Sequence, residues 1–251
     1  MATERLEFDG ATGSRLAGVL HVPDGEARGS VLLAHCFTCS KDLHTMTRLA
    51  SGLAEAGYAV LRFDFTGLGE SGGAFVETTV STNVADLRRA ALALIERGLG
   101  PCAMVGHSLG GAATLLAAGD LHTVRSLAVL GAPLAPAHVR RLLADAAPAI
   151  EREGQATVEI GGRPFPIAQS FLDDLDRHPA GEHLADLGRP LLVVHAVDDA
   201  VVDVAEGEAI FAAAAQPKAF VPLLDADHLL SSRSAADAAL ATITTWLDRT
   251  L

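Results

Sequence analysis

Apolar, strand-like segments alternate with longer helix-like segments through most of this chain, and this alternation constrains the fold more than any other feature. The apolar runs are nearly continuous, as in parallel strands covered by helices on both faces. The expected strands are SVLLAH (30–35), YAVLRFDF (58–65), PCAMVGH (101–107), VRSLAVLGAP (124–133), PLLVVHAV (190–197) and KAFVPLLDA (218–226). The expected helices span residues 43–57, 84–98, 109–119, 204–214 and 235–247. The order predicts a mostly parallel, doubly wound α/β sheet.

Two segments depart from this alternation. Residues 5–10 and 14–23 are short alternating segments joined by a glycine-containing turn, a pattern that predicts an antiparallel β-hairpin. Residues 134–188 hold a helix-like stretch (138–154), a two-strand pattern around residues 161–162 and a second helix-like stretch (167–178). Such a long insertion is either a lid over the binding face or a decoration, and its position before the last sheet elements favours a small lid. We expect a single domain, residues 1–251.

The composition limits the function classes. The chain carries 19 basic and 31 acidic residues, a net charge of −12, which argues against nucleic acid or an anionic membrane as a partner. The N-terminus lacks a secretion signal, and no apolar run approaches the ~18 residues of a membrane span. Three cysteines, an odd number, fit a reducing compartment better than a disulfide scaffold. We therefore expect a cytoplasmic protein with reduced cysteines.

The segment GHSLGG, residues 106–111, is the strongest chemical signal in the chain. It ends an expected strand and opens an expected helix, and G-x-S-x-G at such a junction is typical of a nucleophile elbow. Gly106 and Gly110 would leave room where strand and helix nearly touch, and the positive end of the helix would face Ser108. A chance Gly-Ser-Gly string is the alternative in a chain with 24 glycines, but the strand–turn–helix context disfavours it. Ser108 is the predicted nucleophile.

A serine nucleophile needs a base, and the base needs an acid that orients it. His228 lies in DADHLL, between the last expected strand and the last expected helix, and is the predicted base. His107 is the neighbour of the elbow serine, and we expect it to pack or hydrogen-bond beneath the turn. The candidate acids follow the strand that ends near residue 197: Asp198, Asp199 and Asp203. Their order after Ser108 and before His228 is compatible with each of them.

Taken together, SVLLAH, FDFTGLGESGG, GHSLGG, HAVDDAVV and DADHLL resemble the α/β-hydrolase family across nearly the whole chain. The segments AHCFTCSKD, LRFDFTGLGESGG and FLDDL resemble the hydrolase portion of bacterial proteins in which an α/β-hydrolase is fused to an OsmC-type domain. The chain ends soon after its last expected helix, so we expect neither an OsmC-type partner domain nor its peroxide-reducing activity. The resemblance implies the α/β-hydrolase fold and no metal or organic cofactor.

The resemblance also implies roles for individual residues. In the family the acid lies four residues after the histidine of its strand, which selects Asp199 through His195. The loop after the third strand reads His-Gly-x in the family, and the amide of x is an oxyanion-hole donor. Residues 35–37 read His-Cys-Phe, with cysteine in place of glycine. The amides of Phe37 and Leu109 would then form the oxyanion hole.

Cys36 and Cys39 leave two other interpretations open. Their C-x-x-C spacing, near the start of an expected helix, is compatible with a redox thiol pair, because a helix N-terminus lowers the pKa of a thiol. The same spacing could supply half of a zinc site, but further ligands would be needed and Cys102 lies alone in an expected strand. If the chain is a serine hydrolase, neither cysteine takes part in the reaction.

The sequence thus predicts a serine hydrolase that cleaves carboxylic esters with a short to medium acyl chain. The expected partner is a small-molecule ester, with neither nucleic acid nor membrane involved. Thioesterase, acyltransferase or peptidase chemistry on the same triad remains an alternative, as do a thiol-redox module and a catalytically silent fold that acts as a binding protein. The residues expected to line an apolar substrate pocket are Phe37, Leu134, Phe165, Phe171, Val201 and Leu229.

Overall fold

The computed structural model describes all 251 residues and is organised around a central eight-stranded sheet. Its strands are β1 (Ala2–Asp9), β2 (Arg15–Val22), β3 (Ser30–Ala34), β4 (Ala59–Phe63), β5 (Ala103–His107), β6 (Ser126–Leu130), β9 (Leu191–Ala196) and β10 (Lys218–Leu223). Their order is β1-β2-β4-β3-β5-β6-β9-β10. The pairs β1–β2 and β2–β4 are antiparallel, and all neighbours from β4 to β10 are parallel. The predicted parallel sheet with an N-terminal hairpin is confirmed.

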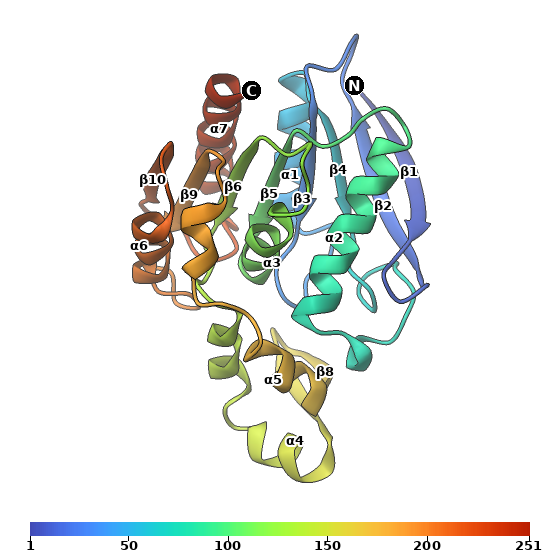
Figure 1. Cartoon of the computed structure of the whole chain (residues 1–251), viewed down its shortest axis with the longest axis vertical. Coiled ribbons are helices and arrows are strands. Elements are labelled where there is room, and N and C mark those ends of the chain that lie inside the picture. Colours follow the sequence, from blue (N-terminus) through green and yellow to red (C-terminus); the bar gives the residue numbers. More distant parts are fainter.

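Helices cover both faces of this sheet (Figure 1). On one face lie α1 (His44–Glu55) and α7 (Arg233–Thr250), and on the other α2 (Val80–Ile95), α3 (Leu109–Ala118) and α6 (Val204–Ala213). Alternate residues of each strand serve opposite faces. In β3, Val31 and Leu33 belong to the core under α1 and α7, whereas Leu32 and Ala34 belong to the core under α2 and α3. Both faces are therefore apolar, which explains the continuous apolar runs.

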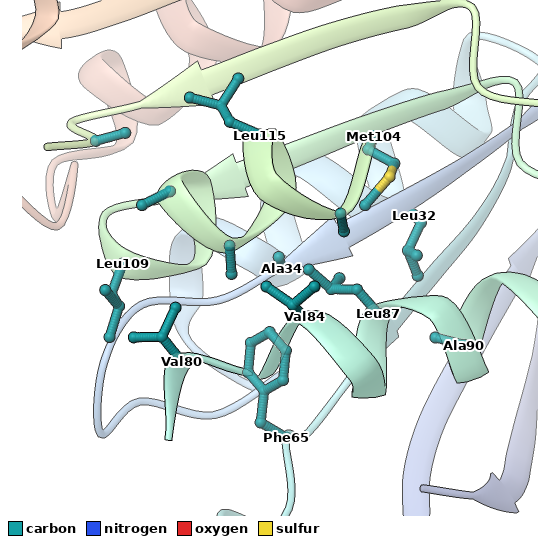
Figure 2. Packing of buried hydrophobic residues seen from close by; sticks show 14 of the residues in the cluster. Leu32, Ala34, Phe65, Val80, Val84, Leu87, Ala90, Met104, Leu109 and Leu115 are labelled. Atoms are coloured by element: carbon teal, nitrogen blue, oxygen red, sulfur yellow. The ribbon is translucent and has the colours of Figure 1, made fainter. Parts of the chain in front are cut away.

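The core under α2 and α3 fixes the start of helix α3. Figure 2 shows Val84 and Leu87 of α2 pointing into the same apolar layer as Leu32 and Ala34 of β3, with Leu109 at the left of the view. Leu109 is only 1% exposed. Burying a leucine side chain contributes about 2 kcal/mol. The turn before Leu109 therefore cannot shift without exposing apolar surface.

Residues 134–188 form a separate unit at the end of the molecule opposite the two termini (Figure 1). Its helices and strands are the 3-10 helix η2 (Pro136–Leu143), α4 (Ala147–Glu153), β7 (Gln155–Ile160), β8 (Arg163–Ala168), α5 (Gln169–Leu175) and the 3-10 helix η3 (Glu182–Asp186). β7 and β8 pair antiparallel as a second, two-stranded sheet. The remaining short helix of the chain is η1 (Phe75–Glu77).

Two helices differ most from the prediction, and the other helix ends differ by three residues or fewer. The expected continuous helix over residues 138–154 is wrong: a 3-10 helix ends at Leu143, and α4 begins at Ala147 with Pro148 in its first turn. Proline has no N–H and favours the first turn of a helix, so a new helix starts there. Helix α2 begins four residues before the expected position 84, because Thr79 and Thr82 form a capping box. No helix of the chain has both the length and the apolar character to cross a bilayer.

Candidate active site

Ser108 occupies the sharp turn between β5 and α3. Its backbone angles are φ 54° and ψ −126°, and positive φ is uncommon outside glycine, so the surroundings must hold this residue in place. The Ser108 amide donates to the carbonyl of Leu130 at 2.8 Å. The Ser108 carbonyl accepts from the amides of Gly111 and Ala112 at 2.8 and 3.2 Å. The turn is thus bound to β6 on one side and to the first turn of α3 on the other.

Gly106 and Gly110 have no room for a side chain. A Cβ on Gly106 would lie 2.6 Å from the carbonyl oxygen of Gly110. A Cβ on Gly110 would lie 2.2 Å from the carbonyl oxygen of His35. Because these neighbours are backbone atoms, only glycine permits the close approach. The elbow therefore packs directly against the loop that follows β3, so a displacement of one would displace the other.

Ser108, His228 and Asp199 form a hydrogen-bonded chain. His228 Nε2 lies 3.0 Å from Ser108 Oγ, and His228 Nδ1 lies 2.7 Å from Asp199 Oδ2. The other carboxylate oxygen of Asp199 accepts hydrogen bonds from the amides of Val201 and Val202, both at 2.9 Å. Asp199 Oδ2 thus faces the histidine and accepts from Nδ1–H, which leaves Nε2 free to accept the proton of the Ser108 hydroxyl.

Asp199 is ionised at neutral pH. Its side chain is fully buried, and burial alone would raise the pKa of Asp199. The hydrogen bonds from His228 and from the Val202 and Val201 amides outweigh burial and hold the pKa below its usual range. A buried carboxylate at this position can therefore stabilise a positive charge on the imidazole of His228.

The two other candidate acids lie away from His228. Asp198 is exposed. Asp203 caps helix α6 by accepting a hydrogen bond from the Ala205 amide at 2.9 Å. Of the three aspartates that follow β9, the structure brings only Asp199 to the histidine.

His107 and Gly131 position the imidazole of His228. His107 is fully buried, and burial, followed by the nearby charge of His228, lowers the pKa of His107 to about 3. The neutral ring lies with Nε2 2.7 Å from the carbonyl oxygen of His228, to which it donates. A Cβ on Gly131 would lie 3.3 Å from Asp199 Oδ2 and 3.4 Å from His228 Nδ1, so glycine leaves room for the pair. The sequence places His107 beside the elbow but does not reveal its contact with His228.

The amides of Phe37 and Leu109 lie on the two segments that meet at the elbow. Neither amide donates a hydrogen bond to any acceptor of the protein. Leu109 directly follows Ser108, and Phe37 lines the same cavity as Ser108. Both amides are free to donate to a substrate oxygen.

His35 holds the loop that carries Phe37. His35 Nδ1 lies 2.8 Å from the carbonyl oxygen of Cys36, and the Phe65 amide donates to His35 Nε2 at 3.3 Å. The ring must therefore carry its proton on Nδ1. Burial lowers the pKa of His35 and keeps it neutral, as these two bonds require.

Cys36 and Cys39 form a disulfide, so the expectation of reduced cysteines is wrong for this pair. The turn between them brings their Cα atoms to 5.4 Å, and the C-x-x-C spacing alone does not separate a bridge from two thiols. Their sulfur atoms are bonded to each other, and no group of three potential metal ligands is gathered anywhere in the chain. Cys102 is free and buried. The disulfide closes a small ring around Phe37 and Thr38.

A buried ion-pair network anchors the far end of this loop. Lys41 Nζ lies 2.8 Å from both Asp64 Oδ2 and Glu70 Oε2, and the Lys41 amide donates to Asp64 Oδ1 at 2.6 Å. The side chains of Lys41 and Asp64 are 2% and 0% exposed. The Glu70 amide also donates to Asp64, at 2.9 Å. No local sequence pattern reveals this network, although Lys41 is one of only two lysines in an arginine-rich chain.

A cavity of about 500 Å³ opens beside Ser108 and His228. The loop after β3 forms one wall, and Leu142, Ile160 and Arg163 of the 134–188 unit form another. The Arg163 guanidinium also donates to the carbonyl oxygen of Thr38. The insertion therefore lies directly over the candidate catalytic groups.

The six apolar residues expected to line the pocket divide into two groups. Those that line the cavity are Phe37, Val201 and Leu229. Those that lie elsewhere are Leu134, Phe165 and Phe171. Phe165 and Phe171 are 9% and 2% exposed and belong to the core, where Phe171 stacks against Phe37 at a centroid distance of 5.2 Å. Leu134 packs against the same core. The expectation fails for these three because apolar character is the same in a core and in a cavity wall.

Comparisons with known proteins identify the family of this chain. Residues 25–169 match the family model described as serine aminopeptidase, S33. No curated protein matches the chain. The esterase domain of a Rhodothermus marinus protein is 41% identical, with 99% of each chain covered and a TM-score of 0.83.

More distant structures share the fold. Est1E from Butyrivibrio proteoclasticus, solved with ferulic acid bound, is 19% identical over 98% of each chain, with a TM-score of 0.77. Alpha/beta hydrolase domain-containing protein 10 from mouse is 20% identical over 98% of this chain and 99% of that one, with a TM-score of 0.80. The chain therefore has the α/β-hydrolase fold and belongs to the S33 serine aminopeptidase family of α/β hydrolases.

Proposed function

We propose that this α/β hydrolase is a serine esterase that cleaves carboxylic esters through an acyl-enzyme on Ser108. The observation that carries the proposal is the hydrogen-bonded chain from Ser108 through His228 to Asp199, at the wall of a cavity. A nucleophile within 3.0 Å of a base, with that base oriented by a buried carboxylate, is the arrangement that activates a serine hydroxyl.

The first half of the reaction forms the acyl-enzyme. Ser108 Oγ attacks the acyl carbon while His228 Nε2 takes the hydroxyl proton, and Asp199 stabilises the imidazolium that results. The amides of Phe37 and Leu109 donate hydrogen bonds to the carbonyl oxygen and stabilise the negative charge that develops on it. Losing one such donor typically costs about 3 kcal/mol of transition-state stabilisation.

The second half releases the acid and regenerates the enzyme. It begins once His228 has given its proton to the leaving alcohol, because the break of the bond to that alcohol completes the acyl-enzyme and leaves space for water. His228 then takes a proton from that water as it attacks the acyl carbon, and the same two amides hold the second oxyanion. Ser108 regains its proton when the tetrahedral intermediate collapses.

The cavity supports an apolar acyl group of short to medium length. About 500 Å³ is at the small end of the range of ligand pockets, and most of its long side chains are apolar, among them Leu142, Ile160 and Leu229. Leu142 and Ile160 belong to the 134–188 unit, and Leu229 lines the same cavity from outside it. We therefore assign that unit the role of a lid. The relative at 41% identity is described as an esterase domain, which supports the same substrate class.

Aminopeptidase activity is the second candidate, because the matching family model is described as a serine aminopeptidase. An aminopeptidase must bind a free α-ammonium group, most readily with a carboxylate. Asp42 is the only carboxylate among the residues that line the cavity. Its oxygens already accept hydrogen bonds from Arg62 and Lys41. With that charge engaged, an ester is the better substrate.

The test is hydrolysis of p-nitrophenyl esters of increasing acyl length, compared with an acyl thioester and an aminoacyl p-nitroanilide. We expect kcat/KM to peak at a short to medium acyl chain and the anilide to be the poorest substrate. Ser108→Ala should lose at least about 10⁴-fold in kcat, since serine nucleophiles contribute that much or more. Ser234→Ala, at an exposed serine that lies outside the cavity lining, serves as the matched control.

Other outcomes would replace the proposal. Faster cleavage of the anilide than of the esters would make the chain a peptidase. Ester hydrolysis that survives Ser108→Ala would remove Ser108 from the mechanism. A folded protein that hydrolyses none of the substrates and takes up no fluorophosphonate would favour a silent binding fold.

A further inference from the structure

We propose that Cys36 and Cys39 are a site of reversible thiol–disulfide exchange with a dithiol, and that their oxidation state sets the hydrolytic rate. The control acts through the backbone amide of Phe37, which the disulfide ring encloses. This inference rests on the proposed esterase function, because it assigns a regulator to the oxyanion hole of that reaction.

The disulfide constrains the peptide that would bind the oxyanion. The ring runs from Cys36 through Phe37 and Thr38 to Cys39, whose amide donates to the Cys36 carbonyl at 3.2 Å. Thr38 has φ 60°, a left-handed conformation that a β-branched residue rarely adopts. A residue held there needs surroundings that fix it, and the covalent bridge and the hydrogen bond from Arg163 to the Thr38 carbonyl constrain this turn.

The contacts on either side of this turn confine the structural change caused by opening the disulfide to the turn itself. Upstream, the Cys36 carbonyl is held by the buried ring of His35. Downstream, the backbone amide of Lys41 is fixed to Asp64 at 2.6 Å. Opening the disulfide therefore removes the covalent constraint on this turn without unfolding its flanks, while Phe37 keeps its stacking on Phe171 and Thr38 keeps its hydrogen bond from Arg163. The Phe37 amide would lose its fixed direction, while Ser108, His228 and Asp199, which the disulfide ring does not contain, would stay assembled.

The sulfur atoms are placed where a small dithiol can reach them. Both cysteines line the cavity that also holds Ser108 and His228. Cys36 is 4% exposed, whereas Cys39 is only partly buried. An incoming thiolate therefore meets the sulfur of Cys39 first, and Cys36 is the leaving group.

The exchange balances with a dithiol as the reductant. One thiolate of the dithiol attacks Cys39 Sγ, the Cys36–Cys39 bond breaks, and Cys36 leaves as a thiolate that takes a proton from water. The second thiolate of the dithiol then attacks the other sulfur of the same dithiol, which is bonded to Cys39 in the mixed disulfide. Cys39 leaves as a thiolate and is protonated in turn. The protein gains two electrons and two protons, and the dithiol becomes a disulfide.

The direction of control follows from the geometry. The structure with the disulfide has both oxyanion amides free of protein acceptors and the Ser108–His228 distance at 3.0 Å. The oxidised form is therefore the active one, and reduction lowers the rate. Because an oxyanion donor acts mainly on the transition state, kcat should change more than KM.

The experiment compares wild-type enzyme oxidised with glutathione disulfide and enzyme reduced with dithiothreitol, using a p-nitrophenyl ester. Alkylation followed by mass spectrometry counts the free thiols in each sample. We expect kcat to fall about tenfold or more on reduction, KM to change less than about twofold, and reoxidation to restore the rate. Cys102→Ser should respond like the wild type. Cys36→Ser/Cys39→Ser should be slow and indifferent to dithiothreitol.

The outcomes separate this inference from the esterase assignment. Equal kcat for the two forms, with two more free thiols in the reduced one, overturns the redox control and leaves the esterase intact. A pair that stays oxidised in excess dithiothreitol also overturns it, as does a fall in Tm without a fall in kcat. If the oxidised enzyme neither hydrolyses esters nor reacts with a fluorophosphonate, the esterase assignment fails and the redox inference fails with it.

Discussion

His107 Nε2 lies 2.7 Å from the carbonyl oxygen of His228, so the strand that ends at the nucleophile also holds the loop of the candidate base. His107 directly precedes Ser108, and 120 residues separate Ser108 from His228. One hydrogen bond thus links the segments that carry Ser108 and His228. It holds the backbone of His228, whose Nε2 lies 3.0 Å from Ser108 Oγ.

Replacing His107 should slow the reaction without removing a reacting group. In His107→Phe the carbonyl of His228 loses its buried donor, which costs about 1–3 kcal/mol and allows the imidazole to shift. We expect kcat to fall about tenfold with little change in KM. His107→Gln keeps a side-chain N–H and should recover part of the loss. Equal losses in both variants, or a lower Tm with unchanged kcat, would show that His107 has only a packing role.

Asp199 should be essential for turnover and its neighbour should not. Asp199→Asn removes the charge that orients and stabilises the imidazole of His228, and such a change lowers kcat by roughly 10⁴-fold in related catalytic triads. The exposed Asp198 offers a matched control, and Asp198→Asn should hydrolyse the same ester within about twofold of the wild type. Steady-state kinetics on both variants would contradict the assignment if Asp198→Asn were the slower enzyme.

The contact between the elbow and the loop after β3 can be tested with two glycines at the two ends of one helix. In Gly110→Ala the new Cβ would lie 2.2 Å from the His35 carbonyl oxygen, so the loop bearing Phe37 must move. We expect a destabilisation of about 1–3 kcal/mol and a fall in kcat of about tenfold or more. Gly119, at the end of α3, has φ −52° and no atom within 4 Å of a built Cβ.

Gly119→Ala should therefore be as stable as the wild type or slightly more so, by up to about 1 kcal/mol, with unchanged kcat. Urea unfolding and ester hydrolysis on both alanine variants provide the comparison. A Gly110→Ala enzyme as active as Gly119→Ala would mean that the elbow does not press on the oxyanion loop.

Lys41 should contribute strongly to stability. Lys41→Met leaves the buried Asp64 carboxylate without its cation, and breaking such a pair costs about 3–5 kcal/mol. Arg152→Met, in the exposed pair with Glu153, should change the free energy of unfolding by less than about 0.5 kcal/mol. Urea unfolding of the two variants measures both effects, and comparable small losses would show that the network contributes little.

The same pair predicts a pH dependence. Burial alone would lower the pKa of Lys41, but its hydrogen bonds to Asp64 and Glu70 outweigh burial and raise it above the ordinary value. A raised pKa in the folded state contributes stability that is fully present below the unfolded value of about 10.4 and is lost as the pH rises through the folded value. The stability difference between wild type and Lys41→Met should therefore stay constant from about pH 7 to pH 9.5. A difference that already shrinks at pH 8 would contradict this.

The residues found from sequence alone are those whose requirements are local. The elbow needs glycines at fixed offsets around Ser108, and the parallel strands need continuous apolar runs, so both patterns are visible in short segments. The position of His228 between the last strand and the last helix is also visible in the sequence. Asp199 needed the family resemblance, because three aspartates follow β9 and only the folded chain brings one of them to the imidazole.

The features missed from sequence depend on distant residues or on ambiguous chemistry. Lys41 meets Asp64 and Glu70 across 23 and 29 residues, and no local periodicity reports such a contact. The sequence places Phe165 and Phe171 in the pocket because a phenylalanine is equally apolar in a protein core and in a cavity wall. The C-x-x-C pair is compatible with thiols, zinc or a disulfide until the turn geometry is known.

The most direct test of Ser108 as the nucleophile is the position at which a fluorophosphonate attaches to the protein. Peptide mass spectrometry should find one equivalent of label on Ser108, with labelling abolished in Ser108→Ala and strongly slowed in His228→Ala, since the probe needs a hydroxyl activated by its base. Label on another residue, or none on a folded wild-type protein, would contradict the catalytic role assigned to Ser108.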